Sequence, residues 1–476
     1  MRFGFRYIVV FVLGLTLASA AWAQWSSDPS KNLALADRRN GNDQVQPKVR
    51  PLSNNGWYVS WFDANPNSPP PIGYSVFLQR LNPKGVEQFH HDGIEVAHLG
   101  NSSTEDYGLD VDTSGNALLA FLDTREGTNQ QVTAAKMSPA GKALWGKLGV
   151  QLTHGQSASN AAPKIAGTSD GDVVVAWTSN SNVVLQKLDP NGHPLWGKGV
   201  VLYESGYNYG LADLHATAGG SVIVSWTRDH GFGSDRYLYA NKLSASGKLL
   251  WGKGHVHVLD SGSLQFGNFP YFVPDGKGGA VFAWYTSSPS LQCFAQHILA
   301  NGSEAFPHNG SAASTNTSQV RVSPAGSYRG ATDEVFLFWT EEDSNQVLNG
   351  VYGQKFNSTG TREWGDSGLT VVPLGADQQI FVQNVQIRAG ALTFWVDQPL
   401  LGSATIQATR LNGQGKVVCQ QFPVSSPPVS SQPGDTGRLS SGQVPSRLSA
   451  VAWEDDRIGN NGIYIQNVNS NCSLGQ

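Results

Sequence analysis

The chain has 476 residues and a formal net charge of −4, and only 14% of its residues are charged. A charge balance this mild does not suggest nucleic acid or an anionic membrane surface as a partner. The 54 glycines favour short strands joined by tight turns over helices, and three cysteines are too few for a disulfide framework to replace a buried core.

The first 23 residues have the pattern of a secretory signal peptide. Arg2 and Arg6 precede an apolar run over residues 7–21, and Ala21-Trp22-Ala23 is a small-x-small cleavage site. The run is too short and too early for a membrane span, and no later segment approaches the ~18 apolar residues that a span needs. We therefore predict a signal peptide over residues 1–23 and a secreted or periplasmic protein over residues 24–476.

One repeated unit then fills the chain, and its third copy shows it most plainly. Alternating or β-branched runs cover residues 163–167, 172–177, 183–188 and 194–202, with glycine turns at Gly171 and Gly192 between them. Short strands separated by such turns are typical of a four-stranded antiparallel meander.

Three sequence positions, here called registers, recur in each copy of the unit. A tryptophan ends the second run every 49 to 60 residues, at Trp61, Trp177, Trp226, Trp284, Trp339, Trp395 and Trp453, with Phe121 in the remaining place. A turn glycine is followed four residues later by an aromatic residue, or by Cys419 in the seventh copy: Phe89, Trp145, Trp196, Trp251, Phe306 and Trp364. Six residues before that glycine the chain most often has glutamine, as in Gln79, Gln186, Gln296 and Gln354, with Ala135, Asn241 and Thr409 in other copies.

Units of this kind are too small to bury their own faces and are stable when they stack radially. We predict an all-β fold, a single β-propeller with eight blades, and seven blades with one insertion as the alternative. The chain after residue 23 begins just before an aromatic slot, filled by Trp25, and ends as it approaches the same slot. The N-terminal strand should therefore complete the last blade and hide its open edge. The slot aromatics, Trp25 included, are expected to be structural, packed between neighbouring blades.

Charged residues follow the second run of several blades. In a propeller these loops share one face with the connections between blades, where ligands commonly bind. Carboxylates that converge there would suit Ca²⁺, sugar hydroxyls or acid–base catalysis. The competing interpretation is that Asp and Arg cap hairpins and pair with each other, because the Asp-x-Arg spacing occurs in two blades. The candidate ligand-binding residues are Asp63, Asp123, Arg125, Arg228, Asp229, Glu341, Asp397, Asp455 and Arg457.

A second set of charges follows the glutamine register: Arg80, Lys136, Lys187, Lys242, His297, Lys355 and Arg410. We expect their stems to cover neighbouring outer strands and their charged ends to lie in solvent. The pairs His90/His91 and His255/His257 offer too few ligands for a metal and are expected to be exposed.

Two of the three cysteines lie near the outer edge of neighbouring blades. Cys419 fills the aromatic slot of blade seven, and Cys472 lies in the following turn of blade eight. In an oxidising compartment a disulfide between them would fix the C-terminus, provided that the blades do not diverge too far. Cys293 would then be an unpaired thiol.

These units resemble the secreted bacterial propeller repeats that combine a Trp-x-Asp-x-Arg strand end, an aromatic-Ala-Gln-Arg-Leu strand and a Gly-x-x-x-Trp turn. The closest copy runs from Trp453 to Gln466. The turn is also similar to the tryptophan-docking motif of eight-bladed quinoprotein dehydrogenases and of their non-enzymatic outer-membrane-assembly relatives. This chain has no adjacent cysteine pair and no matching set of Ca²⁺ and quinone ligands, so the resemblance implies an architecture and not a ligand.

The sequence thus favours a binding or scaffolding module for a protein, a peptide or a glycan, and most of the chain is taken up by architecture. The alternative is a secreted carbohydrate-active enzyme that uses two loop carboxylates, and a quinone- or metal-dependent oxidoreductase is a third reading. We expect no catalytic residues, no cofactor other than Ca²⁺ if the loops converge, and a monomer.

Overall fold

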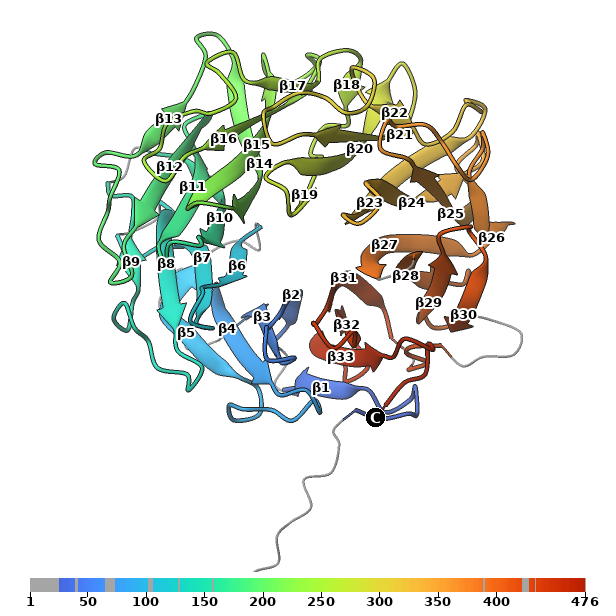
Figure 1. Ribbon diagram of the computed structural model, residues 1–476. Coiled ribbons are helices and arrows are strands. Elements are labelled where there is room, and N and C mark those ends of the chain that lie inside the picture. The colour runs from blue at the N-terminus through green and yellow to red at the C-terminus, as the bar shows by residue number, and fades with distance from the viewer. Residues whose placement is uncertain are drawn as a thin grey trace, which may run out of the picture.

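The computed structural model shows eight antiparallel sheets arranged as blades around a central axis, which confirms the predicted eight-bladed β-propeller (Figure 1). The structure describes residues 25–38, 42–64, 73–101, 106–126, 129–155, 158–387, 390–421, 428–432 and 434–475. The predicted signal peptide, residues 1–23, lies outside the described residues. Within the described ranges no helix is long and apolar enough to cross a membrane.

Each blade orders its strands from the axis outward in chain order. Blades one to four consist of β2 (Gln44–Pro51), β3 (Trp57–Asp63), β4 (Tyr74–Leu81) and β5 (Ile94–Asn101); β6 (Gly108–Val111), β7 (Ala117–Asp123), β8 (Gln131–Met137) and β9 (Val150–Gln151); β10 (Asn160–Gly167), β11 (Val173–Ser179), β12 (Asn182–Leu188) and β13 (Val200–Leu202); β14 (Asn208–Thr217), β15 (Ser221–Asp229), β16 (Tyr237–Leu243) and β17 (Val256–Leu259).

The remaining blades follow the same plan, except that two short segments share the innermost place of blade five. They consist of β18 (Ser263–Leu264), β19 (Phe272–Pro274), β20 (Ala280–Ser288), β21 (Gln292–Ile298) and β22 (Ser311–Ala312); β23 (Val320–Arg329), β24 (Glu334–Glu342), β25 (Asn349–Phe356) and β26 (Leu369–Gly375); β27 (Gln378–Ile387), β28 (Gly390–Gln398), β29 (Thr405–Asn412) and β30 (Val417–Gln421); β31 (Thr436–Gln443), β32 (Ser449–Asp455) and β33 (Gly462–Val468).

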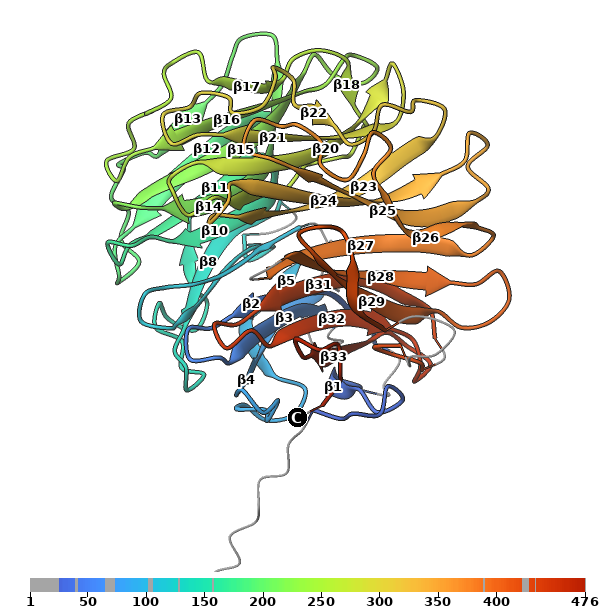
Figure 2. The ribbon, with the colours of Figure 1, turned by 45° about the vertical axis from the view of Figure 1, so that its right-hand side comes forward.

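The N-terminal strand β1 (Leu33–Ala36) is the outermost strand of blade eight, where it pairs antiparallel with β33. Figure 2 shows β1 beside β33 at the C-terminal end of the ring. The prediction that the N-terminus completes the last blade is therefore confirmed, and the ring is closed by hydrogen bonds instead of a continuous chain.

The slot aromatics lie in the seams between neighbouring blades. The indole of Trp145 lies against Gly192 in the turn of the next blade, where a Cβ atom would come within 3.2 Å of the ring. The glycine has a φ of +92°, which other residues rarely adopt. This position therefore requires glycine twice, because of its backbone conformation and because a side chain would collide with the indole. Trp25 lies in the same way against Gly85 of blade one.

The glutamine register orients these aromatics. The side-chain carbonyl of Gln186 accepts hydrogen bonds from the backbone N–H groups of Lys187 (2.9 Å) and Trp196 (3.0 Å). Its amide nitrogen donates to the carbonyl of Gly197 at 3.0 Å. Gln79, Gln296 and Gln354 bond in the same way, so a buried amide fixes the outer turn of each of these blades.

The expectation that the basic residues after the glutamine hold their charged ends in solvent is wrong. The side chains of Lys136 and Lys187 are only 6% and 2% exposed. Lys136 Nζ lies 2.8 Å from Asp112 Oδ2, in the first turn of its own blade. An ammonium this deeply buried needs a carboxylate partner, and the repeat supplies one from that turn.

At the seam between blades seven and eight a disulfide stands where other seams have an aromatic. Cys419 and Cys472 are bonded, with their Cα atoms 5.7 Å apart, so the two blades do not diverge at this radius. Cys293 is the free thiol and is buried. The bridge ties the C-terminal turn to the preceding blade.

Candidate functional site

The candidate loop residues lie around the ring, one group to a blade, because each follows the second strand of its own blade. Asp63, Asp123, Glu341 and Asp397 lie at or near the ends of β3, β7, β24 and β28. A ring of eight blades keeps strand ends of this kind apart, so they do not form one convergent site.

Most of these residues are held by partners in their own neighbourhood. The Arg125 guanidinium donates to Asp123 at 3.0 Å, and the Arg457 guanidinium donates to Asp455 at 2.7 Å. In both blades the arginine and the aspartate two residues before it form one hairpin-capping pair. The other pairs are Glu341 with Arg321 (2.9 Å), Asp397 with Gln379 (2.5 Å) and Asp229 with the backbone N–H of Gly231 (2.9 Å).

Asp63 differs from these carboxylates. Its nearest cation is Arg38, at 3.5 Å, in the segment after β1. Burial raises the pKa of Asp63 to about 6, and the Arg38 charge only partly offsets it. The pair joins the N-terminal segment to blade one.

A second group of charges, the inner charged cluster, lies on or just before the innermost strands of blades one to five. It consists of Lys48, Asp106, Lys164, Asp213 and Tyr271. Lys48 Nζ lies 2.5 Å from Asp106 Oδ1, Lys164 pairs with Asp106 Oδ2, and the Tyr271 hydroxyl donates to the same oxygen at 3.1 Å. One carboxylate therefore connects blades one, two, three and five.

A β-bulge in the innermost strand aims these side chains. In six blades the pairing of the innermost strand with the second strand shifts at a bulge. The first innermost-strand residue after the bulge pairs with the residue just before the repeated tryptophan. That residue is Lys48, Lys164 or Asp213 in blades one, three and four. It is uncharged in blades six to eight, namely Ala325, Gln383 and Ser440.

The two carboxylates of the inner charged cluster have partners in the cluster or beside it. Burial raises the pKa of Asp106, but Lys164 and Lys48 outweigh it and hold this pKa well below its usual range. Asp213 accepts from the backbone N–H of Phe272 at 3.1 Å and pairs with His215 at 3.0 Å. We interpret the cluster as the support of the inner wall and not as a reactive centre.

A cavity of about 380 Å³, here called the blade-four cavity, lies beside blade four. Its volume is within the range of small-molecule sites, ~300–1,000 Å³. Its lining comes from the connection between blades three and four, from β14 to β17, and from the turn before β17: Tyr203, Glu204, Tyr209, Arg228, Tyr239, Lys253, Gly254, His255 and His257.

Arg228 organises the polar side of this cavity. It donates to Glu204 Oε1 at 3.0 Å and to the Tyr239 hydroxyl at 2.7 Å, and its guanidinium lies 3.4 Å from the ring centroid of Tyr207. Burial lowers the pKa of Arg228, but Tyr239 and Glu204 outweigh it and raise that pKa. The cation is therefore fixed in place, with its partners on several sides.

Aromatic rings form the other side. Trp226 stacks on Tyr209 and Tyr239, with centroids 5.6 Å and 6.2 Å apart, and His255 meets its edge at 4.8 Å. Burial and the Glu204 carboxylate raise the pKa of Tyr209 to about 12, so its hydroxyl remains a donor. Tyr203 is 68% exposed and presents its ring to solvent at the cavity wall.

Of the candidate residues chosen from sequence, Arg228 is the one that lines this cavity among the residues that the structure describes. Sequence reasoning missed the tyrosines, although Tyr203, Tyr207 and Tyr209 fall within seven residues between blades three and four. His255 and His257 belong to the cavity and are not simply edge residues.

Only one group of three or more closely spaced potential metal ligands occurs within the described ranges. Asp37, His91 and Asp92 each offer a ligand atom within 4.8 Å of the others. Both nitrogens of His91 already contact carboxylates, Asp37 at 2.9 Å and Glu87 at 3.2 Å. The group does not include the loop carboxylates considered for Ca²⁺, so that expectation stays a prediction.

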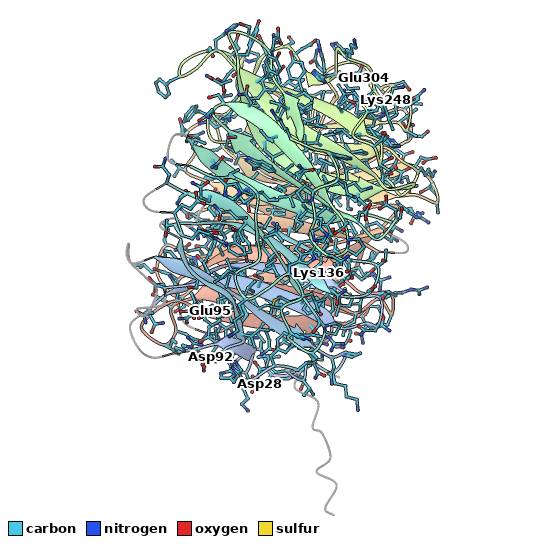
Figure 3. The ribbon with its side chains drawn as sticks, turned by 90° about the vertical axis from the view of Figure 1, so that its left-hand side faces the viewer. Asp28, Asp92, Glu95, Lys136, Lys248 and Glu304 are labelled. Carbon is cyan, nitrogen blue, oxygen red and sulfur yellow. A yellow bond between two sulfur atoms is a disulfide. The ribbon has the colours of Figure 1, made fainter. Side chains whose placement is uncertain are left out.

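The same arrangement occurs at blade five, where His308 contacts Asp260 and Glu304, both at 3.0 Å. In each case the aspartate, Asp37 or Asp260, comes from the connection that enters the blade, and the glutamate comes from the blade's own outer turn. Figure 3 labels Asp92, next to His91, and Glu304 at opposite ends of its view. The two histidines therefore hold the outer turn of their blade to the preceding connection.

These contacts predict a pH-dependent contribution to stability. Burial lowers the pKa of His91, but Asp37 and Glu87 outweigh it and raise that pKa above 6.5. The stabilisation should be complete below pH 6.5 and fade as pH rises through the raised value. His91 is half exposed, so we expect His91→Gln to cost less than about 1 kcal/mol at pH 6 and less still at pH 9, measured by urea unfolding.

His193→Gln is the matched control, since His193 contacts only Asp189 of its own turn, at 3.0 Å. It should lose less at pH 6 than His91→Gln does. Equal losses for both variants, or a loss by His91→Gln that does not change with pH, would contradict the stabilising role given to the contact between His91 and Asp37.

The chain matches no family model and no curated protein sequence. It is similar in structure to the Dos1 propeller, with 11% identity, a TM-score of 0.49, and coverage of 92% of this chain and 95% of that one. A protein of unknown function from Dyadobacter fermentans has 7% identity and a TM-score of 0.41, over 92% of this chain and 97% of that one. An α-L-arabinanase from Penicillium chrysogenum in complex with arabinobiose has 13% identity and a TM-score of 0.40, over 69% and 98%. Likenesses at this level do not extend to function.

Proposed function

We propose that this propeller is a non-catalytic binding module that holds a saccharide unit in the blade-four cavity. The observation that carries the proposal is the combination of an exposed ring, Tyr203, with fixed polar groups on Arg228, Glu204 and Tyr209. A sugar ring offers an apolar face for stacking and hydroxyls for hydrogen bonds, and the cavity offers partners for both.

The charges around the cavity favour binding over catalysis. Among the described residues of the lining, Glu204 is the one carboxylate, and Arg228 already occupies it. Glycoside hydrolysis normally uses two carboxyl groups about 5–9.5 Å apart. Asp123 and Asp455, the alternative acid–base candidates, belong to blades two and eight and pair with their own arginines.

We also propose that the protein works outside the cytoplasm. The support is the disulfide between Cys419 and Cys472, together with the signal-peptide pattern of the first 23 residues. Structural disulfides persist in oxidising compartments and are rare in the cytosol.

The proposal is tested by calorimetric titration of residues 24–476 with a panel of monosaccharides and disaccharides. We expect at least one to bind, and Tyr203→Ala to weaken it by up to roughly tenfold. Contacts with an aromatic ring contribute about 0.5–1.5 kcal/mol, and ~1.4 kcal/mol corresponds to a factor of ten in Kd. Phe232→Ala is the control, since Phe232 is 91% exposed and lies outside the cavity.

Product analysis of the same mixtures separates binding from catalysis. Intact sugars after long incubation support the binding module. Hydrolysis that Glu204→Gln abolishes would replace it with the carbohydrate-active enzyme. A panel without binding, or equal losses in Tyr203→Ala and Phe232→Ala, would remove the saccharide site.

A further inference from the structure

One backbone carbonyl recurs at every seam of the ring, two residues before the residue at the turn-glycine position. It belongs to Pro83, Pro139, Pro190, Ala245, Ala300, Ser358, Gly413 and Ser470. At seven seams a side chain of the preceding blade donates to it. The donors are Trp25 (3.0 Å), Arg80 (3.0 Å), Trp145 (3.0 Å), Trp196 (3.0 Å), Trp251 (3.0 Å), Trp364 (3.3 Å) and Arg410.

The seam between blades five and six is different. Its slot aromatic is Phe306, whose side chain has no N–H group. Its basic residue is His297, whose side chain is shorter than that of lysine. His297 Nε2 turns to Asp275 at 3.0 Å instead of reaching across the seam. Within the described part of the chain, the Ser358 carbonyl therefore has no side-chain donor.

A cavity lies at the same place. The blade-five cavity has a volume of about 510 Å³, and its lining includes His297, Asp275 and Ser358. Leu299 and Ala305 supply apolar wall, and Asp333 lies on the blade-six side. The missing donor and the open space thus coincide, as they should when a shorter side chain replaces a lysine.

The neighbouring seams show which group fits such a space. At blade two, Lys136 Nζ lies 2.8 Å from Asp112 Oδ2, 3.5 Å from the Pro190 carbonyl and 5.7 Å from the ring centroid of Trp145. A carboxylate, a carbonyl and an aromatic face are the partners that a primary ammonium prefers.

Blade five repeats the carboxylate and the carbonyl, with His297 Nε2 on Asp275 Oδ2 where blade two has an ammonium. Asp275 occupies the turn position of Asp112, since the backbone N–H of each donates to the carbonyl four residues later. The bond runs from Asp275 to Gly279 at 3.1 Å and from Asp112 to Asn116 at 3.0 Å. Phe306 fills the aromatic slot but is not among the lining residues of the cavity, whereas the Ser358 carbonyl, in the place of that of Pro190, belongs to a lining residue. The apolar wall of Leu299 and Ala305 would cover the methylene groups that carry an ammonium.

We propose that the blade-five cavity binds a primary alkylammonium group, either the side chain of a lysine in a partner peptide or a free aliphatic amine. The lining offers this ammonium the Ser358 carbonyl and the carboxylates of Asp275 and Asp333. Lys277 also lines the cavity; its side chain is 52% exposed, and its Nζ lies 2.6 Å from Asp333 Oδ1. The site is separate from the blade-four cavity and does not rest on the saccharide proposal.

The test is a calorimetric titration of residues 24–476 with Nα-acetyl-lysine N-methylamide, which keeps the side-chain ammonium, and with n-pentylamine. N-acetyl-norleucine N-methylamide is the matched ligand, because it keeps the alkyl chain and lacks the ammonium. We expect saturable binding of an amine and none of the norleucine compound. Binding of the lysine amide assigns a partner's lysine, and binding of pentylamine alone assigns a free amine. Failure of both amines, or equal binding of the norleucine compound, overturns the proposal.

His297→Lys restores the residue that other blades use, so the new side chain should fill the cavity. We expect amine binding to fall at least tenfold and Tm to rise. Phe306→Trp is the second variant, since it returns an indole N–H to the Ser358 carbonyl, and it should act in the same direction. Unchanged amine binding in both variants would overturn the site. The saccharide titration should be the same in wild type and His297→Lys, which keeps a failure here distinct from a failure of the blade-four cavity.

Discussion

Replacement of Asp106 with alanine is expected to lower the free energy of unfolding by about 2–3 kcal/mol. This is less than the ~3–5 kcal/mol for one partner of a fully buried ion pair, because the Asp106 side chain is 24% exposed. Asp106 accepts from Lys48, Lys164 and Tyr271, which belong to three other blades. Without the carboxylate, two ammonium groups on the inner wall face each other with no counter-charge. The loss should appear in urea unfolding at pH 7 as a lower midpoint.

The dependence on pH follows from the depressed pKa of Asp106. A carboxyl group whose pKa is lower in the folded state stabilises that state above the unfolded value, near 3.9, and loses this contribution as pH falls toward the folded value. The gap between wild type and Asp106→Ala should therefore be constant from pH 5 to 8 and shrink only in strong acid.

Two further variants separate the charge pair from simple disruption. Asp28→Asn removes an exposed pair with Lys31 and should cost far less than Asp106→Ala, because solvent screens an exposed pair. Lys48→Met with Lys164→Met, added to Asp106→Ala, removes the unpaired charges and should recover part of the loss. A triple variant no more stable than the single one would show that the cost of Asp106→Ala does not come from unpaired lysines.

The fold could be predicted from sequence because its main contacts repeat. Each slot aromatic meets a glycine in the next blade, so the spacing of Gly192 and Trp196 in one copy predicts the same seam in every copy. The closing strand followed from the same argument. Trp25 is a slot aromatic without a turn glycine four residues before it, so it belongs to a blade whose other strands lie elsewhere in the chain. Local turns and a constant period are the part of a structure that a sequence expresses directly.

The cavities could not be predicted, because each depends on a departure from the repeat. The blade-four cavity comes from tyrosines in one connection, and the blade-five cavity comes from His297 in a slot that is mostly Lys or Arg. The histidine was visible in the sequence. Its consequence was not, because the basic residues were expected to point to solvent, whereas Lys136 and Lys187 reach across the seam. Because the lysines were expected to point to solvent, the replacement of one of them by His297 did not predict a cavity.

Trp25→Ala is expected to cost about 3–5 kcal/mol, as for other buried tryptophans. Trp25 is only 3% exposed, it lies against Gly85, and its indole N–H donates to the Pro83 carbonyl at 3.0 Å. It belongs to the segment that closes the ring without a covalent bond, and β1 itself has only four residues. The variant should therefore loosen β1 as well as lower the midpoint of urea unfolding.

Trp364→Ala is the matched control, because Trp364 makes the same contact at the seam between blades six and seven, where the chain is continuous. Both variants should lose similar stability. Only Trp25→Ala should expose the amides of β1 to rapid hydrogen exchange, because the strand can detach while blade eight keeps its other three strands. Trp25→Phe should lose about 1 kcal/mol and keep β1 protected, since Phe89 and Phe306 fill the same slot in their blades. Protection of β1 that survives in Trp25→Ala would mean that the hydrogen bonds to β33 alone close the ring.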